Sequence, residues 1–81
     1  MKIYWYENSK NIVGAKVKAL RLENKLTQKE LAEKLQLLGY DFNDLTILRI
    51  EQGKRFVTDY EIRALATFFH VTSDYLLSMD S

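Results

Sequence analysis

The stretch that decides the fold is TQKELAEKLQLLGYDFNDLTILRIEQGKR, residues 27–55. In its first part, apolar residues recur at the spacing of one helix face: Leu31, Ala32, Leu35 and Leu38. Thr27 followed by Glu30 is a capping box, a pair that marks the first turn of a helix. We therefore predict an amphipathic helix that starts after Thr27 and buries this apolar face.

A second short helix is predicted after a turn that contains glycine. Asn43 is a favourable N-cap, and Gly53 can end the helix in the left-handed conformation that glycine adopts readily. Ile47 and Ile50 would pack against the first helix. Two short helices joined by such a turn predict a helix-turn-helix over about residues 27–53. In its DNA-binding form, the second helix enters the major groove.

The same stretch matches a known family at ordered positions. Inside it, the matching residues are Gln28, Glu30, Leu31, Ala32, Ile47 and the run 49–55. Outside it, they are Gly14, Val17, Leu20, Arg21, Leu65, Ala66, Val71 and the run 74–77. These positions resemble the Cro and phage-repressor type of helix-turn-helix, the xenobiotic-response-element family of bacterial regulators. The resemblance implies an all-α, five-helix bundle of the lambda-repressor-like DNA-binding type.

One feature departs from the family pattern. Between Ala32 and Glu51 the chain is longer than the usual spacing, and the extra residues fall within 37–42. They either extend the first helix of the motif or lengthen the turn. A longer turn would change how the second helix sits against the first.

Apolar spacing predicts three further helices. One runs from about residue 9 to residues 24–25 and buries Val13, Val17 and Leu20. Thr58 and Glu61 form another capping box, at the start of a helix that ends near residue 69. A last helix, residues 74–79, follows Ser73 as N-cap. The core residues expected from these two helices are Ile62, Leu65, Ala66, Phe69, Leu76 and Leu77.

Geometry and the resemblance together assign roles in DNA binding. The residues expected to read bases are Asp44, Leu45, Thr46, Leu48 and Arg49, and those expected at phosphates are Thr27, Gln28, Lys29, Asn43, Lys54 and Arg55. Arg49 is the best reader, since a guanidinium can donate to both O6 and N7 of guanine. Leu45 or Leu48 can contact a thymine methyl group. Asp44 either accepts from a cytosine amino group or stabilises the helix dipole.

The resemblance also implies a structural ion pair between Arg21 and Glu51. Such a pair fixes geometry more than it adds stability, because desolvation offsets much of the attraction. The alternative is that Arg21 is an ordinary solvated charge.

We therefore expect a sequence-specific transcriptional regulator, a repressor from a bacterium or phage, whose helix 43–51 enters the major groove of double-stranded operator DNA. The family often carries Ser, Arg or Gln where this chain has Asp44, Leu45 and Leu48. Exposed leucines on a helix also suit a protein partner. The alternative is therefore an interaction module, an antitoxin or anti-repressor, on the same scaffold, because a fold does not fix a function.

The N-terminal residues 1–8 begin with MKIYWYE, an aromatic and β-branched segment that favours an extended arm. The arm either packs on its own domain or pairs with the arm of a second chain, burying Ile3, Tyr4 and Trp5. The segment around Tyr75 and Met79 is the other candidate dimer surface. We expect a homodimer, because two half-sites ~34 Å apart combine the few base contacts of each short helix.

Composition excludes several function classes. The 81 residues suffice for a single domain, residues 1–81, and we expect no second, ligand-sensing domain. No cysteine and one histidine, His70, exclude disulfides, thiol catalysis and a zinc finger. The three glycines are too scattered for a phosphate loop, so we expect no enzyme, cofactor or small-molecule substrate. Without a membrane-spanning run or a signal peptide, the protein should be cytoplasmic.

The net charge is only +1, although a DNA-binding surface is usually basic. We expect the charges to be segregated. The cations expected on one side are Lys16, Lys18, Lys25, Lys29, Lys54 and Arg55, and the carboxylates expected on another are Glu61, Asp74 and Asp80.

Overall fold

The computed structural model describes residues 9–78, and in this range the chain forms five α-helices. They are α1 (Gly14–Glu23), α2 (Gln28–Leu37), α3 (Asp44–Glu51), α4 (Asp59–Phe69) and α5 (Ser73–Leu77). The predicted all-α, five-helix architecture is therefore confirmed. The predicted arm, residues 1–8, lies outside the described residues, as do Met79 and Asp80.

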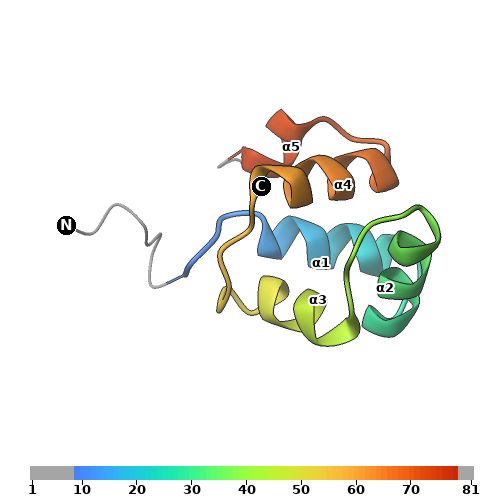
Figure 1. Cartoon of the computed structure of the whole chain (residues 1–81). Helices are drawn as coiled ribbons and strands as arrows, with labels where there is room; N and C mark the ends of the chain where they lie inside the picture. Colours follow the sequence, from blue (N-terminus) through green and yellow to red (C-terminus); the bar gives the residue numbers. More distant parts are fainter. Residues whose placement is uncertain (1–8, 79–81) are drawn as a thin grey trace.

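Helix α1 runs through the middle of the bundle, with α2 and α3 on one side and α4 and α5 on the other (Figure 1). Helix α3 packs against both α2 and α1, and α4 packs against α5. All five helices supply fully buried side chains to one core: Val17, Leu31, Leu35, Ile47, Ile50, Leu65 and Leu76. Burying an aliphatic side chain of this size contributes about 1.5–3 kcal/mol, so this core is the main source of stability.

Helices α2 and α4 both start as predicted. Capping boxes are present at Thr27 with Glu30 and at Thr58 with Glu61, each with both hydrogen bonds. At each start the threonine hydroxyl and the glutamate carboxylate satisfy backbone N–H groups that have no partner inside the helix. The predicted starts of α2 and α4 therefore follow from local chemistry.

The start of α5 differs by one residue from the prediction. Ser73 was expected to be the N-cap, but it is the first helical residue. Thr72 is the cap, because its hydroxyl accepts a hydrogen bond from the N–H of Tyr75 at 3.0 Å. Of the two leucines expected in the core, Leu76 is fully buried, whereas Leu77 is 40% exposed.

The turn between α2 and α3 is longer than two tightly joined helices need, and residues 38–43 lie outside both helices. The prediction that Leu38 belongs to the buried face of α2 is wrong, since Leu38 is 58% exposed. Phe42 is only 2% exposed and takes a place in the core instead. Gly39 allows the chain to reverse, with a φ of +94° that side chains rarely adopt. The extra residues thus lengthen the turn and anchor it through Phe42.

Helix α1 begins at Gly14, later than the predicted start near residue 9. A Cβ atom at Gly14 would lie 2.3 Å from the backbone oxygen of Ile50, so only glycine lets α1 start against the end of α3. In the part of the chain that the structure covers, no helix has the length and apolar character to cross a membrane.

Candidate nucleic-acid interface

The outward side of α3 carries the residues that the sequence assigned to base reading. Asp44, Leu45 and Arg49 are exposed, and Thr46 and Leu48 are half-buried. The opposite side of α3 is fully occupied by the core residues Ile47 and Ile50. The helix therefore presents one short, mixed apolar and polar surface to solvent.

Hydrogen bonds at the start of α3 already engage part of this surface. The Asn43 carboxamide oxygen accepts from the Thr46 N–H at 2.8 Å and from the Thr46 hydroxyl at 3.0 Å. The Asp44 carboxylate accepts from the N–H of Leu45 at 3.0 Å. A carboxylate in the first turn also stabilises the helix dipole. This geometry favours the dipole role for Asp44 over the cytosine contact that the sequence left open.

At the start of α2, Thr27, Gln28 and Lys29 differ in what their side chains do. The Thr27 hydroxyl caps the helix, and Lys29 is exposed. The Gln28 amide donates to the Glu51 carboxylate at 3.0 Å, so this side chain is directed toward the domain. The part of Gln28 that remains available for a phosphate is therefore its backbone, at the positive end of the helix dipole.

A nearly buried ion pair joins the helix-turn-helix to α1. Arg21 donates from Nε to one Glu51 oxygen at 2.7 Å and from Nη2 to the other at 3.0 Å. Arg21 also donates to the backbone oxygen of Leu26 at 2.9 Å. The hydrogen bond to Glu51 raises the pKa of Arg21 above its usual value. The pair that the resemblance implied is thus present, and it holds the end of α3 at one position relative to α1.

The loop between α3 and α4 carries two of the three cations that were expected at phosphates. Lys54 is exposed. Arg55 makes two hydrogen bonds of 2.8 Å to Glu61, one to each carboxylate oxygen. This pairing raises the pKa of Arg55 and lowers the pKa of Glu61. Lys54 is therefore an exposed cation, whereas the charge of Arg55 is neutralised within the chain.

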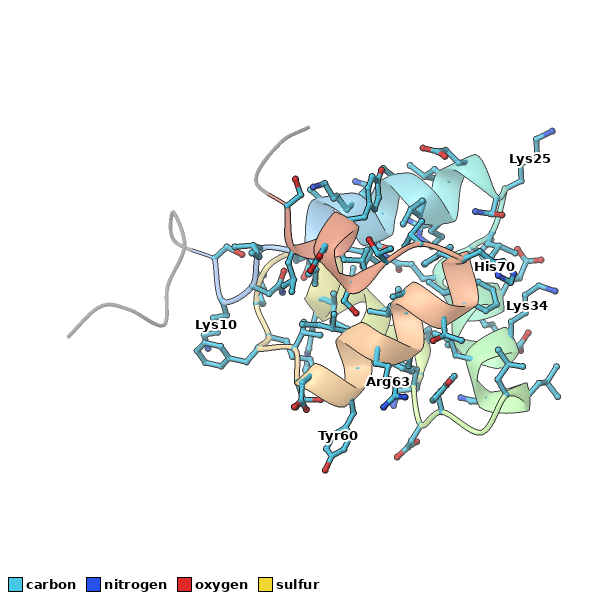
Figure 2. All side chains as sticks on the ribbon, turned by 90° about the horizontal axis from the view of Figure 1, so that it is seen from above. Lys10, Lys25, Lys34, Tyr60, Arg63 and His70 are labelled. Atoms are coloured by element: carbon cyan, nitrogen blue, oxygen red, sulfur yellow. The ribbon has the colours of Figure 1, made fainter. Side chains whose placement is uncertain are left out.

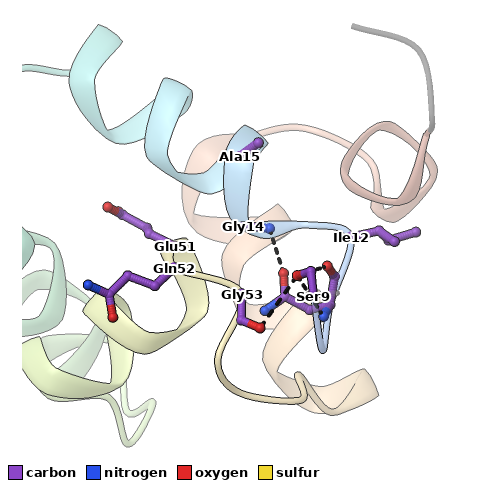
Figure 3. A pocket seen from close by; sticks show the side chains of 8 residues that line it. Ser9, Ile12, Gly14, Ala15, Glu51, Gln52 and Gly53 are labelled. Atoms are coloured by element: carbon purple, nitrogen blue, oxygen red, sulfur yellow. Dashed lines mark hydrogen bonds between the residues drawn. The ribbon is translucent and has the colours of Figure 1, made fainter. Parts of the chain in front are cut away.

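The segment before α1 is bound to the end of α3, an arrangement that the sequence did not predict (Figure 3). The N–H of Lys10 donates to the Gly53 oxygen at 2.8 Å. The Asn11 side chain donates to the backbone oxygens of Ile50 at 3.1 Å and Arg55 at 2.8 Å. Its own oxygen accepts from the N–H of Gly14 at 2.9 Å. Ile50 and Arg55 are far from Asn11 in sequence, so no local signal could have revealed these two contacts.

These contacts border a cavity of about 240 Å³. Its lining residues are Ser9, Asn11, Ile12, Gly14, Ala15, Glu51, Gln52 and Gly53. Among the residues the structure describes, no buried side-chain nitrogen or oxygen lacks a hydrogen-bond partner. The same residues include no cluster of acidic, histidine or cysteine side chains that could hold a metal ion. The buried polar side-chain groups around the cavity are therefore already hydrogen-bonded within the chain.

The expected segregation of charge is only partly present. Lys16 donates to the Ser78 oxygen at 2.6 Å and lies 5.2 Å from the centre of the Tyr75 ring, so it belongs to the α5 side of the bundle. Lys25 lies at the opposite end of the molecule from Lys10 (Figure 2). The predicted segregation is therefore wrong for Lys16. It is also wrong for Arg55 and Glu61, which were expected on different sides but form an ion pair. The exposed cations nearest in sequence to the start of α2 and the end of α3 are Lys29, Arg49 and Lys54.

Comparisons with known proteins show the same arrangement elsewhere. A family model described as helix-turn-helix matches residues 17–76. The P22 c2 repressor, solved in complex with a synthetic operator, superposes with a TM-score of 0.71 at 21% identity, covering 86% of this chain and 98% of the repressor chain. The DNA-binding domain of BldD from S. venezulae superposes with a TM-score of 0.70 at 31% identity, covering 84% and 94%. A crystal structure of the BldD DNA-binding domain gives the same score and identity, covering 84% and 92%. Among curated proteins, none matches this sequence.

Proposed function

This chain belongs to the helix-turn-helix family of Cro and phage repressors, a family of DNA-binding domains rather than enzymes, and on that premise we propose that it is a transcriptional repressor of operator DNA. The observation that carries the proposal is the outward face of α3. This face is exposed on the side opposite the core, and the helix is held in place by the Arg21 and Glu51 pair. A helix presented in this way can enter the major groove.

In this proposal the reading residues lie along α3. Arg49, exposed in the last turn, donates to guanine O6 and N7, a contact worth roughly 1–3 kcal/mol of discrimination. Leu45, which is 47% exposed, and Leu48 contact thymine methyl groups. Thr46 and Asp44 border the contacted bases while they serve the helix start.

Phosphate contacts position this helix on both sides. On one side lie Lys29 and the backbone N–H groups at the start of α2, next to Thr27 and Gln28. On the other side lies Lys54, just after α3. Asn43, the N-cap of α3, adds a phosphate contact at the start of this helix. These contacts set register and orientation without reading sequence.

The repressor acts as a homodimer in the cytoplasm of a bacterial or phage-infected cell. One α3 helix has only eight residues and reaches few base pairs. Two copies on half-sites ~34 Å apart combine their contacts, which gives a site with two-fold symmetry.

Binding to duplexes at several salt concentrations tests the proposal. We expect detectable affinity for random duplex at low salt and tighter binding to an operator selected from a random library. Arg49→Ala should lose about 1–3 kcal/mol of preference at one base pair of the half-site, because the bidentate contact is removed. Lys54→Ala should weaken all sequences alike. Lys34→Ala, which removes an exposed cation from the far end of α2, is the matched control and should change neither property.

A second function is favoured by one observation, the exposed Leu45 next to the acidic Asp44. This pair suits a protein partner, as in an antitoxin or anti-repressor. The same experiment separates the two functions. If the wild-type chain does not bind random duplex even at low salt, the DNA proposal fails and the partner-binding function replaces it.

A further inference from the structure

We propose that Arg55 does not bind a phosphate. It is instead a positioning residue: bound to Glu61, it fixes the conformation of the α3–α4 loop, which carries Lys54. The inference rests on the proposed DNA binding and assigns Arg55 a different role from the phosphate contact that its sequence position suggested. Glu61 lies outside the helix-turn-helix, so the inference also adds a residue of α4 to the DNA-binding machinery.

The guanidinium of Arg55 is already committed within the chain. Its Nη1 donates to one Glu61 oxygen and its Nη2 to the other, both at 2.8 Å, which is the fork-to-fork geometry of a strong pair. Nη1 also donates to the backbone oxygen of Phe56 at 3.0 Å. The Arg55 side chain is 33% exposed and the Glu61 side chain 18% exposed, so water screens this pair less than it would an open surface pair.

Charge gives the second step of the argument. A cation strengthens DNA binding by displacing counterions from phosphates, and this requires net positive charge at the contact. Arg55 and Glu61 together carry none. If Arg55 turned toward DNA, the Glu61 carboxylate would lose its strongest partner while lying near the phosphates. Lys54, the preceding residue, is exposed and can supply the positive charge.

The pair is also built into its surroundings at both ends. The backbone oxygen of Arg55 accepts from the Asn11 side chain at 2.8 Å, which links the loop to the segment before α1. The Glu61 oxygen that accepts from Nη1 of Arg55 also accepts from the Thr58 N–H at 2.9 Å, as part of the capping box of α4. One carboxylate therefore connects the α3–α4 loop to the first turn of α4.

A cavity of about 400 Å³ shows where this connection lies relative to α3. Arg55 and Glu61 line it together with the caps of both helices, Asn43 of α3 and Thr58 of α4. Releasing Arg55 would therefore loosen the loop that follows α3. It would also remove part of the cavity wall beside the first turn of α3. We expect the orientation of α3 in the groove to depend on the pair.

The test measures the salt slope, the change in log affinity per unit change in log salt concentration. Lys54→Ala should reduce the slope by about 0.9, the value for one lost phosphate contact. Arg55→Ala should weaken binding several-fold by changing the orientation of α3. It should leave the slope unchanged, because the long, exposed side chain of Lys54 still reaches a phosphate from a loosened loop. If thermal melting shows that the alanine variant is unfolded, the variant Arg55→Gln is measured in its place, because glutamine retains hydrogen-bond donors for the loop. A slope reduced by about 0.9 in either Arg55 variant would overturn the inference.

Glu61→Gln provides the converse measurement, because glutamine preserves the capping box while weakening the hold on Arg55. Its matched control is Asp59→Asn, which removes an exposed carboxylate from the same turn of α4. We expect the salt slope of both variants to be the same. A steeper slope and tighter binding for Glu61→Gln than for Asp59→Asn would show that Arg55 is a phosphate ligand that Glu61 restrains.

Coupling between the two residues distinguishes positioning from independent structural effects. In the variant Arg55→Ala with Glu61→Gln, the loss of DNA affinity should equal the larger single loss, because both changes remove one connection. Losses that add would contradict the inference. If the wild-type chain binds no duplex, the proposed function and this inference fail together, whereas wild-type binding with a wrong slope or additive losses overturns the inference alone.

Discussion

At the scale of single residues, Glu51 is the carboxylate on which α1, α2 and α3 converge. It accepts two hydrogen bonds from Arg21 of α1 and one from Gln28 of α2. Its side chain is only 3% exposed and that of Arg21 is 10% exposed. An unpaired charge at this depth is costly, so the three side chains specify one relative position of the helices.

Removing one member of this pair should therefore cost more than replacing both. We expect Glu51→Ala to lower the free energy of unfolding by about 3–5 kcal/mol, because Arg21 would be left as a nearly buried charge without its partner. Combining Arg21→Met with Glu51→Leu should cost clearly less. Urea denaturation of each variant gives the comparison, and a double variant no more stable than Glu51→Ala would contradict it.

Exposed and buried positions were predictable where the helix face alone decides them, whereas contacts between side chains of different elements were much less predictable. The spacing of residues 44–49 correctly separated the outward side of α3 from the buried Ile47 and Ile50. It did not reveal that Gln28 binds Glu51, or that Arg55 binds Glu61. Position along a helix sets which face a residue occupies, whereas these partners lie on other elements that meet only in the fold.

At the scale of elements, the two helix starts marked by capping boxes were the most predictable features. Threonine with glutamate three residues later satisfies backbone groups within one turn, so the starts of α2 and α4 are set by sequence alone. The turn before α3 was not predictable in this way. Leu38 continues the apolar spacing of α2, yet the helix ends at Leu37 and Phe42 enters the core. Tertiary packing overrides the pattern there.

Two truncations in this turn test which residue anchors it. Phe42→Ala should destabilise the domain by about 3–5 kcal/mol, the range for a buried phenylalanine, because it removes a core side chain. Leu38→Ala, the matched control from the apolar pattern, should stay within about 0.5 kcal/mol of wild type because the side chain is largely exposed. Both values come from chemical denaturation. Equal losses would mean that Leu38 packs in the core after all.

At the scale of the whole molecule, a net charge of +1 conceals an uneven distribution of paired and exposed charges. Arg21 and Arg55 are neutralised by Glu51 and Glu61, so they support the fold rather than the surface potential. In the proposed function, non-specific attraction to DNA comes from the exposed cations, among them Lys29, Arg49 and Lys54. Composition could not show this, because it counts paired and exposed charges alike.

The same pairing makes the stability of the domain depend on pH in acid. Arg55 and the Thr58 N–H lower the pKa of Glu61 in the folded protein, so this carboxylate binds a proton less readily folded than unfolded. Its contribution to stability is therefore present above the ordinary glutamate pKa, 4.5, and is lost as pH falls through the lower folded value. Thermal melting from neutral pH into acid should show wild type more stable than Glu61→Gln at neutral pH and converging with it below about pH 4.5.

The two capping boxes differ in this respect, since Glu30 is fully exposed and its pKa is lowered chiefly by the Thr27 backbone, without an arginine. Glu30→Gln should accordingly change the acid profile less than Glu61→Gln. Parallel melting curves for wild type and Glu61→Gln at all pH values would show that the charge of Glu61 does not stabilise the fold.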